Sequence, residues 1–228
     1  LYEDLIPGVR AAAVCAVALM LASCGLGRGH YLDSLLDPEK DPPLFELSGV
    51  PFFPQRAHHC GPSSLATVLA FSGVDVTPDY LAEMVYLPGR AGSLPLELTA
   101  ASRGLGRMPD RLTAELEEIV RERRAGRPVL VLLNLGSSRY PVWHFAVVVG
   151  YAREEDRLIL HSGSRRPQPL RVSQFRDAWR GAGSCAMVVV EPGEMSVTAR
   201  AEHFVREAAA LAEVGMTEAA RKPFRAAA

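Results

Sequence analysis

Cysteine is scarce in this sequence, and no two cysteines stand at the spacing of a metal-binding pair. The 228 residues include four cysteines, which are Cys15, Cys24, Cys60 and Cys185. Structural zinc sites typically use closely spaced pairs such as Cys-x-x-Cys, so the sequence gives no support for one. A phosphate-binding P-loop is also absent, and we expect the protein to use no cofactor.

An excess of either charge is lacking as well. The 25 lysines and arginines nearly balance the 26 aspartates and glutamates, and the net charge is -1. Short basic clusters occur at 121–127 and 165–166, where we predict a solvated helix end and a loop. Nucleic-acid-binding domains carry a concentrated basic surface, so we expect no nucleic-acid partner.

The hydrophobic run near the start of the chain is too short to cross a bilayer as a helix. Residues 11–23 are almost all apolar, and their number fits the core of a secretory signal instead. We therefore predict that residues 1–23 form a signal peptide. The alternative is a buried hydrophobic helix in which Cys24 has no special role.

The residues at the end of this run resemble a bacterial lipobox. The chain reads Leu-Ala-Ser-Cys-Gly at 21–25. The resemblance implies cleavage before Cys24 and two or three acyl chains on the new N-terminus, which together anchor a protein firmly. Gly25 is not the aspartate that commonly retains lipoproteins at the inner membrane. We therefore expect a lipid-anchored protein of the cell envelope, at the outer membrane and facing the periplasm.

Two further segments flank the predicted globular part at 49–193. Residues 24–48 contain a proline-rich, acidic stretch, which predicts a tether between membrane and domain. The tail at 198–228 is helical in composition and resembles one tetratricopeptide-like helical hairpin. A single repeat of that kind cannot bury its own apolar face. The tail must therefore dock on the domain, bind a protein partner or be the remnant of a longer array.

The predicted domain divides into a helical half and a sheet half. Apolar residues at helical spacing predict four helices, at 60–72, 78–85, 93–102 and 112–124. Short β-branched runs then predict strands at 128–133, 145–151, 158–160 and 186–190, with a hairpin turn at 153–156 and a short helix at 173–179. Segregated helices and a largely antiparallel sheet indicate an α+β domain.

The first predicted helix opens with a cysteine. Cys60 is followed by Gly61 and Pro62, and proline just inside a helix start is favourable. A side chain there faces unpaired backbone N–H groups and the positive end of the helix dipole, which favour a thiolate over a thiol. Only a few per cent of an ordinary thiol, with a pKa of about 8.5, is ionised at neutral pH. The position of Cys60 therefore suits a nucleophile.

A thiolate nucleophile needs a base, and the sheet half supplies a histidine. His144 opens the apolar strand that ends at Tyr151. At the start of a strand it would lie at the edge of the sheet, where a cysteine on a packed helix could reach its ring. A lone histidine in such a place is commonly structural. Together with Cys60 and the amide of Gln55, however, it indicates a catalytic base.

Three motifs in this order resemble the papain-like cysteine peptidases of the bacteriocin-processing, double-glycine-leader type. They are Gln55, the run Cys-Gly-Pro-Ser at 60–63 and the run from His144 to Tyr151. The resemblance implies a papain-like fold with the helical half packed on the sheet. It also implies that Cys60 attacks a carbonyl carbon, that His144 transfers the proton and that Gln55 donates an N–H to the oxyanion, with the backbone N–H of Cys60 as a second donor.

The third catalytic position differs from the pattern of this family. Its members carry an aspartate there, which orients the imidazole, whereas this chain reads Leu-His-Ser-Gly at 160–163. We expect Ser162 to accept the imidazole N–H, with His161 and Asn134 as alternatives. Replacing an orienting aspartate can cost up to about 10,000-fold in a serine triad, and a cysteine–histidine pair depends on it less.

The same residues leave several interpretations open. We predict a cysteine peptidase that hydrolyses a peptide or protein substrate through a Cys60 thioester. The alternatives are a catalytically weak peptide-binding or scaffolding module, which the missing aspartate favours, and transfer of the acyl group to an amine.

The remaining histidines and cysteine have simpler interpretations. His58 and His59 invite a metal site, but adjacent side chains point in different directions, and no carboxylate is at hand to orient such ligands. We expect both histidines to line the cleft or tune the thiolate. Cys185 lies in an apolar strand, where a small buried side chain is a better interpretation than a disulfide to Cys60.

Overall fold

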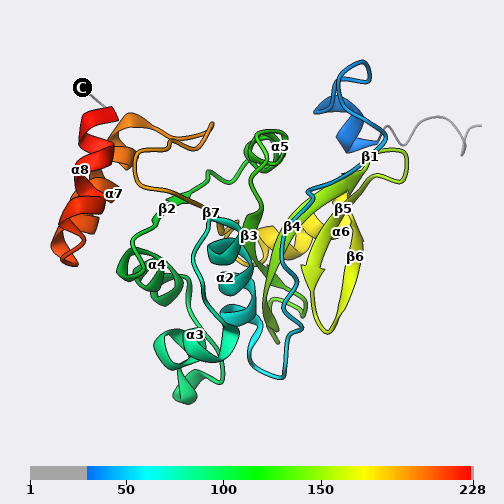
Figure 1. Ribbon diagram of the computed structural model, residues 1–228. Coiled ribbons are helices and arrows are strands. Elements are labelled where there is room, and N and C mark those ends of the chain that lie inside the picture. Colours follow the sequence, from blue (N-terminus) through cyan, green and yellow to red (C-terminus); the bar gives the residue numbers. More distant parts are fainter. Residues whose placement is uncertain (1–29, 227–228) are drawn as a thin grey trace, which may run out of the picture.

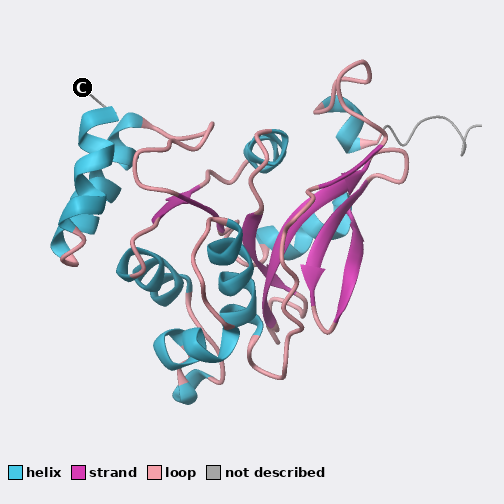
Figure 2. Ribbon diagram, in the orientation of Figure 1, coloured by secondary structure: helices cyan, strands magenta, loops and turns pink. Residues whose placement is uncertain are grey.

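A seven-stranded sheet with helices on both faces forms the centre of the structure (Figures 1 and 2). The computed structural model describes residues 30–226, so the predicted signal peptide and Cys24 lie outside the described residues. The strands are β1 (Leu44–Glu46), β2 (Met108–Arg111), β3 (Val129–Asn134), β4 (Trp143–Ala152), β5 (Arg157–Ser162), β6 (Arg165–Arg171) and β7 (Ala186–Val190). The helices are α2 (Cys60–Phe71), α3 (Pro78–Val85), α4 (Pro95–Gly104), α5 (Leu116–Arg124), α6 (Val172–Arg180), α7 (Ala201–Glu213) and α8 (Thr217–Ala226), with 3-10 turns η1 (Tyr31–Ser34) and η2 (Pro88–Arg90).

The sheet is antiparallel throughout its paired strands. Its order is β2-β7-β3-β4-β5-β6. The short β1 pairs with the last residues of β4, next to the stretch of β4 that pairs with β3. This arrangement confirms the α+β prediction, with a helical half that precedes most of the sheet.

Both faces of the sheet are buried, and successive residues of β4 alternate between two hydrophobic cores. Phe145 and Val147 belong to the core formed with α2, α3 and α4. Ala146 and Val148 belong to the core formed with α5, α6 and the tail. Strands that are buried on both faces carry continuous apolar runs, which is why these strands could be predicted from the sequence.

The predicted helices form, although two of them begin later than expected. Thr77 caps α3 by accepting a hydrogen bond from the backbone N–H of Tyr80 at 3.3 Å. The third predicted helix begins at Pro95 rather than at residue 93, and the fourth begins at Leu116 rather than at residue 112. In front of the fourth helix, residues 108–111 form β2 by pairing with β7.

Two basic clusters differ from their predictions. The expected loop at 165–166 is the start of β6, a strand at the edge of the sheet, where proline residues are tolerated because one side of the strand makes no ladder. Arg123 is only 1% exposed although a solvated helix end was expected. Its guanidinium lies 5.0 Å from the centre of the Phe45 ring, and burial lowers its pKa to about 10.

Residues 30–47 form a strap on the domain rather than the free tether predicted for 24–48. Leu32 and Leu36 are buried in the core on the α5 and α6 face. Phe45 stacks on Tyr151, with ring centres 5.8 Å apart, and Asp41 forms an ion pair with Arg124. Proline and acidic residues predict an open chain, but these leucines and the β1 pairing fix the segment to the domain.

The tail forms a helical hairpin that docks on the globular domain. Phe204 and Leu211 of α7 are buried in the same core as Met108 of β2. Arg103 of α4 forms a two-point ion pair with Glu207, at 2.9 and 2.7 Å, and both side chains are largely buried. Of the three arrangements expected for the tail, the structure has the one in which it packs on the domain.

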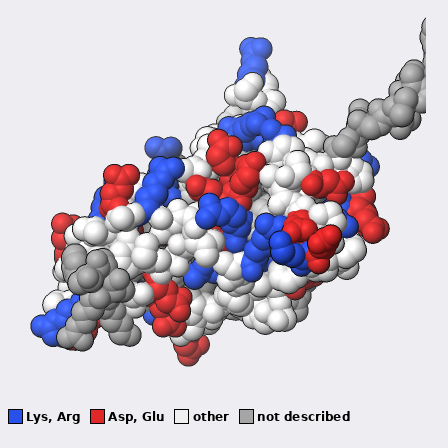
Figure 3. Space-filling view, turned by 90° about the horizontal axis from the view of Figure 1, so that it is seen from above, with Lys and Arg blue, Asp and Glu red and all other residues white. Residues whose placement is uncertain are grey.

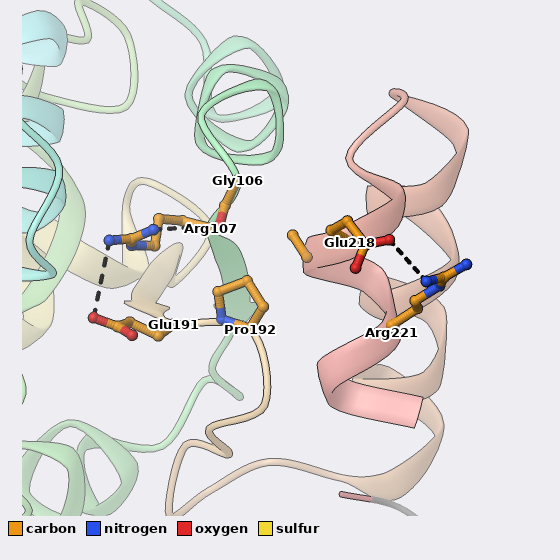
Figure 4. A pocket seen from close by; sticks show the side chains of 7 residues that line it. Gly106, Arg107, Glu191, Pro192, Glu218 and Arg221 are labelled. Atoms are coloured by element: carbon orange, nitrogen blue, oxygen red, sulfur yellow. Dashed lines mark hydrogen bonds and ion pairs between the residues drawn. The ribbon is translucent and has the colours of Figure 1, made fainter. Parts of the chain in front are cut away.

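A cavity of about 380 Å³ lies between one side of α8 and the domain (Figure 4). On the domain side, Arg107 lies 3.9 Å from Glu191, and on the helix side Glu218 lies 2.8 Å from Arg221. Each charged pair is therefore formed within one side of the cavity. The buried apolar residues and the Arg103–Glu207 pair, rather than charges across this cavity, connect the tail to the domain.

Shortening a buried tail residue is expected to destabilise the whole domain. Leu211→Ala should lower the free energy of unfolding by about 2 to 4 kcal/mol, because Leu211 is fully buried in the shared core. Val214→Ala, at a residue that is 48% exposed, should change it by less than about 0.5 kcal/mol. Urea unfolding of both variants measures this. A Leu211→Ala chain as stable as the Val214→Ala control would show that the tail does not fold together with the domain.

Charged side chains of both signs are mixed on the face of the molecule that Figure 3 shows. Basic and acidic residues lie side by side there, as expected from the nearly equal totals of basic and acidic residues.

Within residues 30–226, no helix combines the length and the apolar character needed to cross a membrane.

Candidate active site

Cys60 is the first residue of α2, as the sequence predicted. It is partly buried and packs against the core beneath α2. No acidic residue occupies the first turn of the helix, so the positive end of the helix dipole faces no neighbouring carboxylate from its own turn. The chain enters the helix through a tight turn in which the N–H of His59 donates to the carbonyl of Arg56 at 3.1 Å.

His58 takes a left-handed backbone conformation in that turn. Its φ angle is +63°, a region that costs a residue with a Cβ roughly 1 to 2 kcal/mol. Such local strain persists where the surrounding structure requires it, and it is common at functional sites. Here the turn sets the direction in which the chain reaches Cys60.

His144 lies near the start of β4 and contacts Ser162. Its Nε2 atom is 2.8 Å from the Ser162 hydroxyl oxygen. The imidazole is partly buried, and burial lowers the pKa of His144 below its ordinary value. A neutral imidazole that is held at Nε2 leaves Nδ1 as the ring nitrogen for another partner.

Strand geometry explains why Ser162, and not His161, meets His144. Leu160 lies in the core on the α5 and α6 face, and Ser162 follows it by two residues, so both point to the same side of β5. His161 points to the other side, where its ring meets Phe52 edge to face at 5.3 Å and its Nε2 lies 3.8 Å from Glu46. His161 is therefore not the partner of His144.

Asn134 is not the partner of His144 either. Its side-chain oxygen accepts hydrogen bonds from the N–H groups of Gly136 and Val142, at 3.0 and 2.9 Å. Its amide nitrogen donates to the carbonyl of Ser137 at 3.3 Å. Asn134 thus organises the loop between β3 and β4, and of the three sequence alternatives the structure brings Ser162 to the histidine.

Gln55 connects the three segments that carry the candidate residues. Its side-chain nitrogen donates to the carbonyl of Phe145 at 3.0 Å and to the hydroxyl of Ser64 at 3.1 Å. Its side-chain oxygen accepts from the N–H of Gly163 at 2.8 Å. The backbone groups of Phe145 and Gly163 fix the orientation of the amide, because one is an acceptor and the other a donor.

The bonding of Gln55 differs from the sequence expectation. Both amide hydrogens are donated inside the protein, so neither points freely at a substrate oxyanion. Its partners, Ser64 and the Phe145 carbonyl, lie far from it in the sequence or carry no local signal of this contact. Ser64 is a buried residue of α2 with no local signal of a special role, and only the fold brings its hydroxyl to the amide.

The start of α2 packs against the start of β4. A Cβ atom placed on Gly61 would lie 3.5 Å from the Phe145 ring and 2.6 Å from the Ser93 hydroxyl. Only glycine fits this close approach without displacing a neighbour. The fold therefore sets Cys60 and His144, the immediate neighbours of Gly61 and Phe145, on adjoining ends of a helix and a strand.

A cavity of about 450 Å³ lies beside Gln55 and the first turn of α2. Its lining includes His59, Gln55 and Ser63, with apolar walls from Phe53 and Pro78. His59 also lies 5.7 Å from the Tyr86 ring. The expectation that His59 lines a cleft therefore agrees with its position, whereas His58 is exposed.

Metal ligation has no structural support in the described part of the chain. Residues 30–226 contain no group of three or more histidine, cysteine or carboxylate side chains that could hold a metal ion.

Cys185 is a free, buried cysteine, and Cys60 is free as well. Burial raises the pKa of the Cys185 thiol, so it is poorly suited to act as a nucleophile.

The stability of the protein is expected to fall in acid partly through His144. Its pKa is lowered on folding, so the unfolded chain takes up the proton first. The contribution of His144 to the free energy of unfolding is fully present above about pH 6.5, the ordinary pKa of histidine. It is lost as the pH falls through the lowered pKa of the folded state. Urea unfolding gives the free energy of unfolding of wild type and of His144→Gln. The difference between these two free energies should be constant above about pH 6.5 and should change below it. A constant difference down to about pH 5 would contradict this assignment.

Comparison with known proteins identifies the family. Residues 47–187 match the model of the Peptidase_C39 like family. The chain belongs to this Peptidase C39-like family. No curated protein matches the chain.

A solved structure of a C39-like peptidase shares the fold. A C39-like peptidase of Bacillus anthracis is 21% identical, with a TM-score of 0.53, and the match covers 68% of this chain and 100% of that one. The peptidase domain of Streptococcus ComA, a bifunctional ABC transporter, is 21% identical with a TM-score of 0.49, covering 62% and 98% of the two chains. The Bacillus anthracis structure shows that the fold is that of a C39-like peptidase, and at this identity it shows the fold alone.

Proposed function

We propose that this C39-like protein is a cysteine peptidase that uses Cys60 as nucleophile and His144 as base. The observation that carries the proposal is the set of hydrogen bonds around Gln55 and Ser162. These bonds connect the cysteine helix, the histidine strand and the turn after β5 at one place. Gly61, next to the partly exposed Cys60, packs against Phe145, next to His144, whose pKa burial lowers. A structural core has no need of such residues at the adjoining ends of a helix and a strand.

The proposed reaction proceeds through a thioester. The Cys60 thiol gives its proton to Nδ1 of His144 while Sγ attacks the carbonyl carbon of the scissile peptide bond. The oxyanion is stabilised by the N–H groups at the start of α2. The tetrahedral intermediate collapses as His144 returns the proton to the leaving amine, which departs and leaves an acyl-Cys60 thioester. Water then gives a proton to His144 and attacks the thioester, which releases a carboxylic acid and regenerates the thiol.

Ser162 holds His144 less strictly than a carboxylate would. A carboxylate only accepts, so it selects the ring form with a proton on Nε2, whereas a serine hydroxyl can accept or donate. The hydroxyl therefore orients the ring but does not fix its tautomer. This weaker control supports a second candidate function, a peptide-binding module with slow chemistry. Transfer of the acyl group to an amine instead of water uses the same thioester.

Thiol labelling by an electrophilic peptide probe tests the proposal across pH. Cys60 should react faster than a free thiol near about pH 6, and Cys60→Ala should remove the label. Cys185, whose pKa is raised by burial, serves as an internal control that labels slowly. If Cys60 reacts no faster than a free cysteine at that pH, the nucleophile assignment is wrong and the binding-module alternative stands.

The cellular setting is part of the proposal. We infer a lipoprotein anchored through Cys24 at the outer membrane, with the domain facing the periplasm and only the exposed side of the docked tetratricopeptide-like tail open to a protein partner. The lipobox-like residues 21–25 support the anchor. Incorporation of a radiolabelled fatty acid should disappear in Cys24→Ala, and incorporation that survives this change would refute the anchor.

A further inference from the structure

An exposed apolar surface lies on the hairpin directly before His144. We call residues 135–143, from the end of β3 to the first residue of β4, the aromatic loop. The side chains of Leu135, Tyr140, Val142 and Trp143 are exposed, with Tyr140 at 73% and Trp143 at 54%. Single exposed apolar residues are ordinary, but a cluster of large ones on a single hairpin marks a surface for another molecule.

The aromatic loop is held in one conformation by hydrogen bonds. Leu135 donates to the carbonyl of Val142 at 2.8 Å, and Ser137 donates to the carbonyl of Tyr140 at 3.1 Å. The Ser137 hydroxyl accepts from the N–H of Tyr140 at 3.1 Å. A Cβ on Gly136 would lie 2.2 Å from the Tyr140 carbonyl oxygen, so the close crossing of the loop requires glycine. The side chains are therefore displayed on an ordered backbone, which lowers the entropy cost of binding.

The loop is continuous with the candidate active site. Leu133 pairs with His144 and Asn134 pairs with Trp143 in the β3–β4 ladder. The same Asn134 side chain that closes the loop accepts a hydrogen bond from Val142, two residues before His144. A ligand on the exposed face of the loop would therefore extend toward the histidine.

We propose that the aromatic loop binds an apolar stretch of the polypeptide substrate beside the scissile bond. This proposal rests on the proposed peptidase function and adds the class of substrate, a polypeptide with bulky apolar side chains near the cleavage point. Tyrosine and tryptophan are enriched among the residues that contribute most to binding, because each combines a large apolar surface with a polar edge. Leu135 and Val142, which face each other across the hairpin, add purely apolar side chains.

The position of the strap favours a polypeptide over a bilayer as the occupant. The ten residues of β4 span roughly 33 Å. The loop ends at the first of them, Trp143, and the strap pairs with the last, where Leu44 lies opposite Ala152. Figure 1 shows the strap, in blue, beside this end of β4. The chain thus arrives from its N-terminus at the far end of β4. An anchor at Cys24 would hold that end, rather than the loop, toward a membrane.

Tryptophan fluorescence of a Cys60→Ala chain tests binding without cleavage. The sequence has two tryptophans, and Trp179 is buried, so a change in emission on binding reports Trp143. The probes are two pools of random decapeptides, one with leucine and phenylalanine fixed at two positions and one with serine at both. The apolar pool should shift the emission to the blue at a concentration at least about 10-fold lower than the serine pool.

Paired variants provide the control. Leu135→Ser with Tyr140→Ser should raise the half-maximal concentration of the apolar pool by about 10-fold or more. Leu44→Ser with Leu96→Ser, at two exposed leucines on β1 and α4, should leave it within about 2-fold. An equal response to both pools, no response to the apolar pool, or an equal loss in the control pair would overturn the proposal.

Two further measurements separate the alternatives. Binding of the full chain to vesicles of phosphatidylethanolamine and phosphatidylglycerol should be the same for wild type and the Leu135→Ser, Tyr140→Ser chain. Weaker vesicle binding by the variant would make the loop a membrane contact and overturn the proposal.

Thiol labelling of wild type tests the peptidase function by itself. An unreactive Cys60 in a chain that still prefers the apolar pool would contradict the chemistry and support the docking surface.

Discussion

His144→Ala is expected to lower kcat/KM for peptide cleavage by at least about 1000-fold, whereas Ser162→Ala should lower it by about 10-fold. Removing the imidazole removes both the acceptor for the Cys60 proton and the donor to the leaving amine. Removing the Ser162 hydroxyl loses only the hydrogen bond at Nε2, 2.8 Å long in the structure. Steady-state cleavage of a fluorogenic peptide measures both values.

Ser173→Ala is the matched control for the serine variant. Ser173 lies exposed on α6, so its loss should change kcat/KM by less than about 2-fold. Equal losses in Ser162→Ala and His144→Ala would show that the hydroxyl does more than orient the ring.

A Ser162→Asp chain adds a carboxylate at the same place, which favours imidazolium. Its pH profile should therefore move to higher pH relative to wild type.

The pairing of His144 with Ser162 could be narrowed from the sequence but not decided there. Counting back across the hairpin turn places residues 161–164 near His144, and alternation along β5 then separates Ser162 from His161. The register of the strands was the missing information, because a shift by one residue exchanges the two faces. In the structure Val147 lies opposite His161, which sets Ser162 on the side of His144.

Segments stabilised by distant partners were the hardest to predict. The strap contains prolines and acidic residues, yet Leu32 and Leu36 are buried in a core built largely from residues after 108. β2 has no apolar alternation, and it forms because β7 offers an open edge. The helix at 60–71 was predictable because its apolar pattern and its punctuation are local. Gln55 was predictable as a residue of the site, while its partners were not.

Gln55→Ala is expected to reduce both the rate and the stability. The change leaves the carbonyl of Phe145 and the N–H of Gly163 without their side-chain partner, and each unsatisfied buried group costs about 1 to 3 kcal/mol. It also removes the connection between α2, β4 and the turn at Gly163, and misplacing the reacting groups by about 1 Å costs on the order of 100-fold in rate. Cleavage kinetics and urea unfolding of the same preparation separate the two effects. Gln174→Ala, at an exposed glutamine on α6, is the control.

Ser64→Ala distinguishes a purely structural Gln55 from one that also contacts the substrate. Ser64 takes one of the two hydrogens of the amide, so its removal frees that hydrogen for an oxyanion. We expect the free energy of unfolding to fall by about 1 kcal/mol. The rate of cleavage should stay within about 3-fold of wild type, because the freed N–H donor offsets the loss of the hydrogen bond that helps to hold the Gln55 amide. Loss of rate as large as in Gln55→Ala would mean that the amide acts only by connecting α2, β4 and the turn at Gly163. In that case the backbone N–H groups at the start of α2 would be left to stabilise the oxyanion, and the chemistry of this site would depend on how accurately the turn at His58 directs them.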